Sequence, residues 1–249
     1  MNFTNSPKCA VLGYGSWATA IVKTLTVNHH HVDWLVLNED IRESLHTYSR
    51  NAKYLPWCYI DKEFITPTSD INAAVKDADI VILAMPSAFM KKFLEPLTES
   101  LADKIVVSAV KGIIPGDYKT VVEYLHDHYD LSYKQIGLIT GPTHAEEVAR
   151  ERLSYLTVVC TDPENAKCIG QKLSTKYIHL TYSQDLYGTE YAAILKNIYA
   201  LAAGMAIGLG YGDNFLAVLI SNCAAEMTRF LKESYPYERD TQASAYLGD

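Results

Sequence analysis

Lys196 is the only charged side chain between Glu190 and Asp213, in a stretch that otherwise resembles the interior of a helix. Burial of an unpaired ammonium disfavours its charged form, so such a position suits a lysine that gives and takes a proton near neutral pH. Helical spacing places the small residues Ala192 and Ala200 beside it, which leaves room for a ligand. The alternative is a lysine whose stem is buried while its ammonium reaches solvent.

A glycine-rich loop near the N-terminus could hold phosphate groups. The order Gly-x-Gly-x-x-Ala at Gly13, Gly15 and Ala18 lies between a short apolar run and a segment rich in helix formers. In a dinucleotide-binding fold the first glycine permits a tight turn, the second leaves room for pyrophosphate, and the small third residue lets helix and sheet pack closely. We therefore expect this loop to bind a dinucleotide rather than serve only as a turn.

The choice between NAD and NADP stays open. An acid that binds the ribose 2′-hydroxyl is expected at the end of the second strand, where Asn38 stands with Arg42 nearby. Leu37 either walls the adenine or belongs to the core. Phe89, after another predicted strand, either flanks the cofactor or packs internally.

Two further segments follow predicted strands, at the edge where α/β sheets collect ligands. Lys111 comes directly after a buried run and before a glycine, and it is either a ligand group or a solvated loop lysine. Gly141 opens the second segment, in which Thr143 and Glu146 have the spacing of a capping box. The backbone N–H groups at this predicted helix start also suit a phosphate or carboxamide.

Apolar runs alternate with helical patterns up to residue 183. We expect strands at 9–12, 32–37, 80–84, 105–110, 136–140, 155–160 and 177–180. Helices are expected at 41–48, 72–75, 88–97, 118–128, 143–150 and 163–173, and after the alternation stops, at 187–206 and 214–232, with Asp213 or Asn214 as the cap of the last one. This order predicts an α/β fold with a doubly wound, Rossmann-type, mostly parallel sheet over residues 1–183. Residues 184–249 are expected to begin an all-helical C-terminal domain, truncated here.

Composition limits the partners and the compartment. The formal net charge of −7 argues against nucleic acid as the main partner. Five widely spaced cysteines indicate reduced thiols in a cytoplasmic protein, and His29, His30 and His31 have no spaced partners for a metal site. We interpret the apolar stretch around Lys196 as a buried helix rather than a membrane span, since it has a central charge and several glycines.

Seven motifs together resemble the NAD(P)-dependent glycerol-3-phosphate dehydrogenases of bacterial type. They cover essentially the whole chain, in order, at residues 13–20, 51–56, 85–87, 110–112, 141–143, 195–197 and 247–249. The resemblance implies an enzyme that transfers a hydride between NAD(P)H and dihydroxyacetone phosphate, giving glycerol 3-phosphate for glycerophospholipid synthesis. It implies a soluble protein, and the apolar faces of the helical part favour a homodimer.

The resemblance also implies roles for single residues. Lys196 is expected to be the acid and base for the substrate's C2 oxygen. The resemblance implies that Lys111, Gly141, Thr143, Lys196 and Asp249 line the substrate site, and that Ser16, Trp17, Lys111 and Ala145 contact the cofactor. From the glycine pattern and from position in the chain we add Asn197 to the substrate site, and Gly13, Gly15, Leu37 and Phe89 to the cofactor site. If Lys111 lies near Lys196, like charges would lower the proton affinity of Lys196.

Two departures from the family pattern affect these expectations. Relatives continue past Asp249 into a segment with an Arg-Asn pair that grips substrate and cofactor, so the chain as given is expected to bind cofactor but turn over poorly. Leu216, Asn222 and Cys223 stand where relatives commonly carry Lys, Arg and Gly, which affects one helix surface. The alternatives are a hydroxy-acid or hydroxyacyl dehydrogenase on the same scaffold, and a non-catalytic NAD(P) sensor.

Overall fold

The computed structural model describes residues 6–241 and 243–246 and contains one eight-stranded sheet. The strands are β1 (Cys9–Leu12), β2 (Val32–Leu35), β3 (Ile65–Thr68), β4 (Ile80–Leu83), β5 (Ile105–Ser108), β6 (Ile136–Thr140), β7 (Ser154–Cys160) and β8 (Ile178–Ser183). Their order across the sheet is β3-β2-β1-β4-β5-β6-β7-β8. All neighbouring pairs are parallel except β6 and β7, which confirms the predicted mostly parallel sheet.

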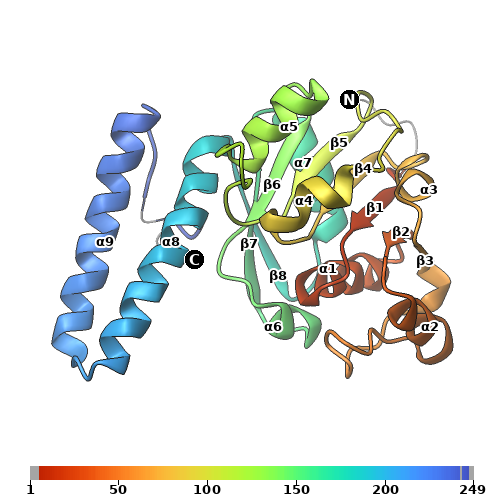
Figure 1. Ribbon diagram of the computed structural model, residues 1–249, viewed down its shortest axis with the longest axis horizontal. Helices are drawn as coiled ribbons and strands as arrows, with labels where there is room; N and C mark the ends of the chain where they lie inside the picture. The colour runs from red at the N-terminus through yellow and green to blue at the C-terminus, as the bar shows by residue number, and fades with distance from the viewer. Residues whose placement is uncertain (1–5, 242, 247–249) are drawn as a thin grey trace.

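Helices cover both faces of this sheet, as Figure 1 shows with α4 in front and α7 behind. In this part of the chain they are α1 (Ser16–Val27), α2 (Glu39–Tyr48), α3 (Ile71–Val75), α4 (Ser87–Leu94), α5 (Val121–Tyr129), α6 (Ala145–Ala149) and α7 (Pro163–Leu173). Alternate residues of β1 point to opposite sides: Cys9 and Val11 join the core under α1 and α7, whereas Ala10 and Leu12 join the core under α3, α4 and α5. A strand buried on both faces is therefore apolar throughout.

β3 was not predicted from the sequence. It contains Pro67, which cannot donate a backbone hydrogen bond, and a proline argues against a central strand. In the structure β3 is the edge strand and pairs with β2 alone. The proline thus indicates an edge position in the sheet and does not exclude a strand.

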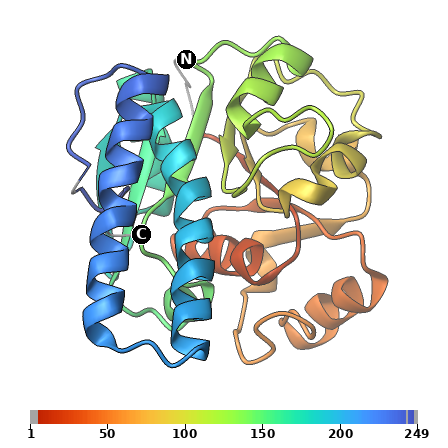
Figure 2. The same cartoon turned by 60° about the vertical axis from the view of Figure 1, so that its left-hand side comes forward.

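Two long helices follow the sheet, α8 (Leu186–Gly208) and α9 (Asp213–Ser234). They lie side by side and project away from the sheet (Figures 1 and 2). The predicted cap of α9 is wrong, because the cap residue is Gly212, Asp213 is already helical, and no side chain caps the first turn.

α8 is only partly the buried helix that its composition predicts. Its first two turns pack against the sheet domain, and Ala192 and Ala193 are buried. Further along, the apolar side chains of Ile198, Leu201 and Met205 are 57%, 64% and 57% exposed. Among the described residues, α8 is also the one helix whose length and apolar composition would allow it to cross a membrane. The prediction of burial is wrong for this second half, because α9 covers only one side of it.

Candidate functional site

The turn after β1 has the geometry that its glycines predict. Gly13 has φ +126°, and a Cβ placed on it would collide with the carbonyl oxygen of Ala84, at the end of β4. A Cβ placed on Gly15, by contrast, meets no atom within 4 Å. Ala18 is fully buried, as close packing of helix on sheet requires. The chain itself therefore needs a glycine at residue 13, whereas the space at Gly15 stays open in front of the first turn of α1.

Two side chains from distant segments brace this turn. The indole nitrogen of the buried Trp34 donates a 2.6 Å hydrogen bond to the Gly13 carbonyl. The amide nitrogen of the fully buried Asn51 donates to the Tyr14 carbonyl and to the hydroxyl of Thr19, both at 2.9 Å. Asn51 begins one of the seven motifs, and its hydrogen bonds explain that motif physically, because they hold the turn at residues 13–15 in shape.

The two kinds of glycine allow a sharp prediction. Gly15→Val should fold normally, because its side chain enters open space, but it should weaken NADH binding at least about tenfold, or about 1.4 kcal/mol. Gly13→Ala is the matched variant, and it should destabilise the fold by about 1–3 kcal/mol through its backbone conformation and its collision. Thermal unfolding and NADH titration by fluorescence separate the two effects. Unchanged NADH affinity in Gly15→Val would contradict a pyrophosphate site here.

Loops after β4, β5 and β6 lie along the same edge of the sheet as this turn, because these strands are parallel to β1. The loops after β4 and β5 touch, since a Cβ on Gly112 (φ +120°) would stand 2.7 Å from the Ser87 hydroxyl oxygen. Lys111, just before Gly112, is exposed at this edge. The strand order reverses between β1 and β4, which is where ligands collect in open α/β sheets.

The loop after β6 differs from its prediction in one respect. Gly141 has φ +116°, and a Cβ there would lie 2.7 Å from the Tyr155 carbonyl oxygen, so glycine is required. The predicted capping box is wrong: α6 begins only at Ala145, its cap residue is His144, and the hydroxyl of Thr143 donates to the Gly141 carbonyl at 3.1 Å. Thr143 therefore stabilises the turn itself.

The remaining predicted cofactor residues lie in varied surroundings. Ser16 and Trp17 begin α1 and are half-buried, as is Ala145. Leu37 and Phe89 are 44% and 56% exposed, so neither belongs to the core.

The two polar residues at the predicted ribose corner make contacts within the protein. The side chain of Asn38 accepts from the Ile41 N–H and caps α2, while Arg42 donates to the Val36 carbonyl at 2.6 Å. Neither contact discriminates NAD from NADP.

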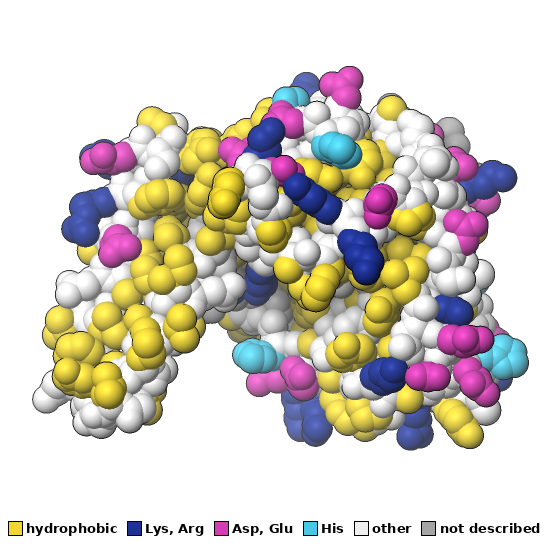
Figure 3. All heavy atoms as spheres, viewed as in Figure 1, with side chains coloured by type: hydrophobic (Ala, Val, Ile, Leu, Met, Phe, Trp, Pro, Cys, Tyr) yellow, Lys and Arg dark blue, Asp and Glu magenta, His cyan; other side chains and the backbone are white. Residues whose placement is uncertain are grey.

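Lys196 lies midway along α8 and is half-buried. It lines a groove of about 230 Å³ between α8 and α9, with Tyr199, Cys223, Met227 and Tyr246 among the other lining residues. Asn197, the next residue, is exposed. Figure 3 shows a hollow between the two long helices and the sheet domain. Asp249 lies outside the described residues.

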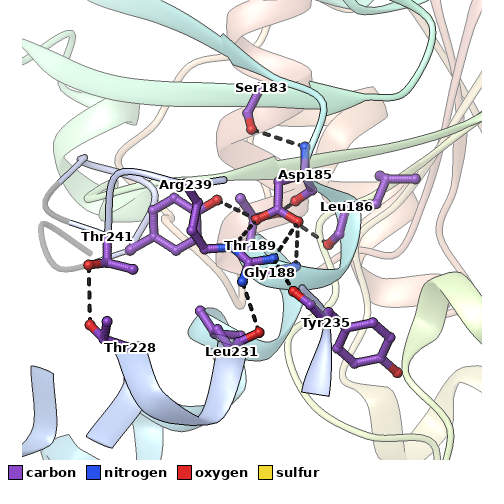
Figure 4. A network of polar contacts seen from close by, with 11 residues as sticks. Ser183, Asp185, Leu186, Gly188, Thr189, Thr228, Leu231, Tyr235, Arg239 and Thr241 are labelled. Carbon is purple, nitrogen blue, oxygen red and sulfur yellow. Dashed lines mark hydrogen bonds and ion pairs between the residues drawn. The ribbon is translucent and has the colours of Figure 1, made fainter. Parts of the chain in front are cut away.

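A buried polar cluster joins the start of α8 to the segment after α9 (Figure 4). The Asp185 carboxylate accepts from the Gly188 N–H at 2.9 Å, from Arg239 Nε at 2.7 Å and from the Tyr246 hydroxyl at 2.7 Å. Arg239 also donates to the carbonyls of Leu231 and Tyr235, both at 2.9 Å, at the end of α9. The side chains of Asp185 and Arg239 are each 5% exposed. This cluster fixes the helix that carries Lys196 and brings Tyr246 to the groove.

Sequence reasoning missed this cluster. Arg239 stands between Glu238 and Asp240, in a polar run typical of a solvated loop. Its partner Asp185 is 54 residues away, and Tyr246 is 61 residues from Asp185. No local pattern in the sequence pairs these residues.

Glu190 is a second buried group that the sequence analysis did not use. Its carboxylate accepts from the Val121 N–H at 2.8 Å and from the Val122 N–H at 3.2 Å, at the start of α5. Burial raises the pKa of Glu190 from 4.5 to about 7, although the hydrogen bonds to its carboxylate act in the opposite direction. The sequence did contain a signal for this buried carboxylate, because Glu190 is the last acidic residue before the apolar part of α8.

This raised pKa predicts a pH-dependent stability. The folded state holds the Glu190 proton more tightly than the unfolded state does. The contribution of this proton to the free energy of unfolding is therefore fully present below about pH 4.5 and is lost as pH rises through about 7. The loss is on the order of 3 kcal/mol. Urea unfolding of the wild type and of Glu190→Gln between pH 4.5 and 8 measures it as the difference between the two proteins. A difference that does not change with pH would contradict the raised pKa.

The cysteines are free thiols in the structure. Cys9, Cys58 and Cys160 are buried. Burial raises the pKa of the Cys9 thiol to about 12 and that of Cys160 to about 11. These side chains therefore pack as small apolar groups and do not act as nucleophiles near neutral pH.

Comparison with known proteins agrees with this geometry. The model of the NAD-dependent glycerol-3-phosphate dehydrogenase N-terminus matches residues 8–166, and that of the C-terminus matches residues 185–249. The NAD(P)+ glycerol-3-phosphate dehydrogenase of Leuconostoc citreum is 32% identical over 247 residues, which are 97% of this chain and 73% of the relative. That of Pseudomonas fluorescens is 34% identical over 227 residues, 91% of this chain and 66% of the relative.

Solved structures have the same fold. The glycerol-3-phosphate dehydrogenase of Coxiella burnetii superposes with a TM-score of 0.88 at 24% identity, over 98% of this chain and 74% of that one. The Saccharomyces cerevisiae enzyme gives a TM-score of 0.82 at 25% identity, over 98% of this chain and 76% of that one. On the family models and the curated relatives, this chain belongs to the NAD-dependent glycerol-3-phosphate dehydrogenase family.

Proposed function

We propose that this protein reduces dihydroxyacetone phosphate to glycerol 3-phosphate with NADH or NADPH, and catalyses the reverse reaction. The observation that carries the proposal is the match of the family models to residues 8–166 and 185–249, together with a half-buried lysine, Lys196, on the helix that faces the strand-end loops. The product feeds glycerophospholipid synthesis, and we place the enzyme in the cytoplasm.

The turn between β1 and α1, residues 13–15, is suited to the cofactor, and we call it the phosphate loop. The open space at Gly15 and the first turn of α1 behind it fit a pyrophosphate, because the N-terminus of a helix presents backbone N–H groups and a partial positive charge. Trp34 and Asn51 keep this loop in one conformation. When bound, the nicotinamide supplies the hydride that reaches C2 of the substrate.

The protein's own residues handle the proton and the phosphate. Lys196 Nζ gives a proton to the C2 oxygen of dihydroxyacetone phosphate during reduction and takes it back in the reverse direction. Lys111, exposed at the edge of the sheet, attracts the anionic substrate. We assign Asn197 and Asp249 to the same substrate site, with Gly141 and Thr143 forming the turn at its border.

Initial rates test this function and its nearest rival. The full chain is assayed for NADH and NADPH oxidation with dihydroxyacetone phosphate, and separately with 2-keto acids and 3-ketoacyl substrates. We expect turnover with dihydroxyacetone phosphate alone. Turnover with one of the other substrates would assign the protein to a related dehydrogenase. Cofactor binding with no turnover on any of them, even in a chain extended beyond Asp249, would identify a dinucleotide sensor.

We also propose that two copies of the chain associate through the long helices. Ile198, Leu201 and Met205 recur every three or four residues on α8 and are 57–64% exposed, more apolar surface than one helix normally leaves in water. Sedimentation velocity should report a dimer for the wild type and a monomer for Leu201→Asp. A monomeric wild type at micromolar concentration would contradict the dimer.

A further inference from the structure

The segments that carry Lys196 and Lys111 are connected through the carboxylate of Glu190. Glu190 lies on α8, six residues before Lys196, or about 9 Å along the helix axis. It is 5% exposed and accepts two hydrogen bonds from the first turn of α5. A buried polar group that loses its hydrogen bonds carries a large desolvation cost. The hydrogen bonds of Glu190 therefore hold α8 at one position on α5.

The loop between Lys111 and the start of α5 is held in shape by contacts within itself and with α4. The Ile114 N–H donates to the Lys119 carbonyl at 2.9 Å, and Ile114 is fully buried. Asp117 forms a 2.7 Å ion pair with Lys91 of α4. With Gly112 seated against Ser87, these contacts make the loop a fixed extension of α5 rather than a free linker.

We propose that Glu190 is a positioning residue that sets the distance between Lys196 and Lys111. The connection runs from Lys196 down the rigid turns of α8 to Glu190, across two hydrogen bonds to α5, and back through the closed loop to Lys111. A displacement of about 1 Å in a reacting group can cost about 100-fold in rate, so such a link acts on turnover. This inference rests on the proposed function.

Glu123 offers a matched control within the same turn. It completes the capping box of α5 by accepting from the Thr120 N–H at 2.9 Å, and it also accepts from the Tyr235 hydroxyl. Removing it weakens the same helix start but leaves the contact between α8 and α5 in place. A purely structural role of Glu190 would make the two residues equivalent for turnover.

The test compares Glu190→Asp, Glu190→Gln and Glu123→Ala in the full chain. Glu190→Asp withdraws the carboxylate from α5, whereas Glu190→Gln keeps an acceptor oxygen at the same reach. We expect kcat with dihydroxyacetone phosphate to fall roughly 10- to 100-fold in Glu190→Asp, with the NADH dissociation constant unchanged, and to return to within about threefold of the wild type in Glu190→Gln. Glu123→Ala should lose stability and keep its kcat.

A wild-type kcat in Glu190→Asp would overturn the positioning role, as would equal losses of kcat in Glu190→Asp and Glu123→Ala. Either result leaves the proposed function intact, provided that the wild type reduces dihydroxyacetone phosphate. A wild type that does not reduce it fails at the earlier step. The unfolding midpoint of each variant, measured alongside, shows whether a loss of kcat reflects a loss of folded protein.

Discussion

Replacing Lys196 with Ala should lower kcat for dihydroxyacetone phosphate reduction by about 10²–10⁴-fold. The NADH dissociation constant should change less than about twofold. The reason is that the variant removes the group proposed to exchange a proton with the C2 oxygen and leaves the phosphate loop untouched. Stopped-flow rates and NADH fluorescence titration measure the two quantities.

Two further variants sharpen this result. Lys196→Arg keeps a positive charge but cannot give up its proton near neutral pH, so it should be as inactive as Lys196→Ala. Lys232→Ala removes an exposed lysine from the last turn of α9 and should behave as the wild type. Retained activity in Lys196→Ala would refute the acid and base role, and full activity in Lys196→Arg would reduce Lys196 to an electrostatic contribution.

Replacing Arg239 with Ala should lower the free energy of unfolding by about 3–5 kcal/mol. The change leaves the buried Asp185 carboxylate without its cation and removes the donors to the carbonyls at the end of α9. Urea unfolding at pH 7 measures the loss.

The control for this variant is an ion pair of the same type at the surface. Lys167 and Glu164 approach to 2.9 Å, but their side chains are 61% and 75% exposed, so Lys167→Ala should cost at most about 1 kcal/mol. Similar losses in Arg239→Ala and Lys167→Ala would mean that the Asp185 cluster does not stabilise the junction between α8, α9 and Tyr246.

Most of the sheet was predictable because buried parallel strands are continuous apolar runs. The run at β1 and the glycines after it identified both a strand and the loop that follows it, and α7 was predicted with its observed bounds, Pro163–Leu173. Proline at N1 and a capping Asp162 mark the start of that helix. Local signals sufficed for these two elements.

Predictions failed where a contact over a long sequence distance decides the structure. Asp185 caps α8 and accepts hydrogen bonds from Gly188, Arg239 and Tyr246. Only Gly188 is near Asp185 in sequence. The exposure of Leu201 was equally invisible, because an apolar helix has the same composition whether its partner lies within the chain or in a second copy. One failure was local: the spacing of Thr143 and Glu146 fitted a capping box, but the Thr143 hydroxyl donates to the Gly141 carbonyl two residues earlier.

The distance from Lys196 Nζ to the substrate is the most direct test of the proposed mechanism. It can be measured in a crystal structure of the full chain with NADH and glycerol 3-phosphate bound. We predict that Nζ lies about 2.6–3.2 Å from the C2 oxygen, directly or through one water, with the pyrophosphate beside Gly15. An ammonium that points into bulk solvent, with the substrate bound elsewhere, would contradict the mechanism.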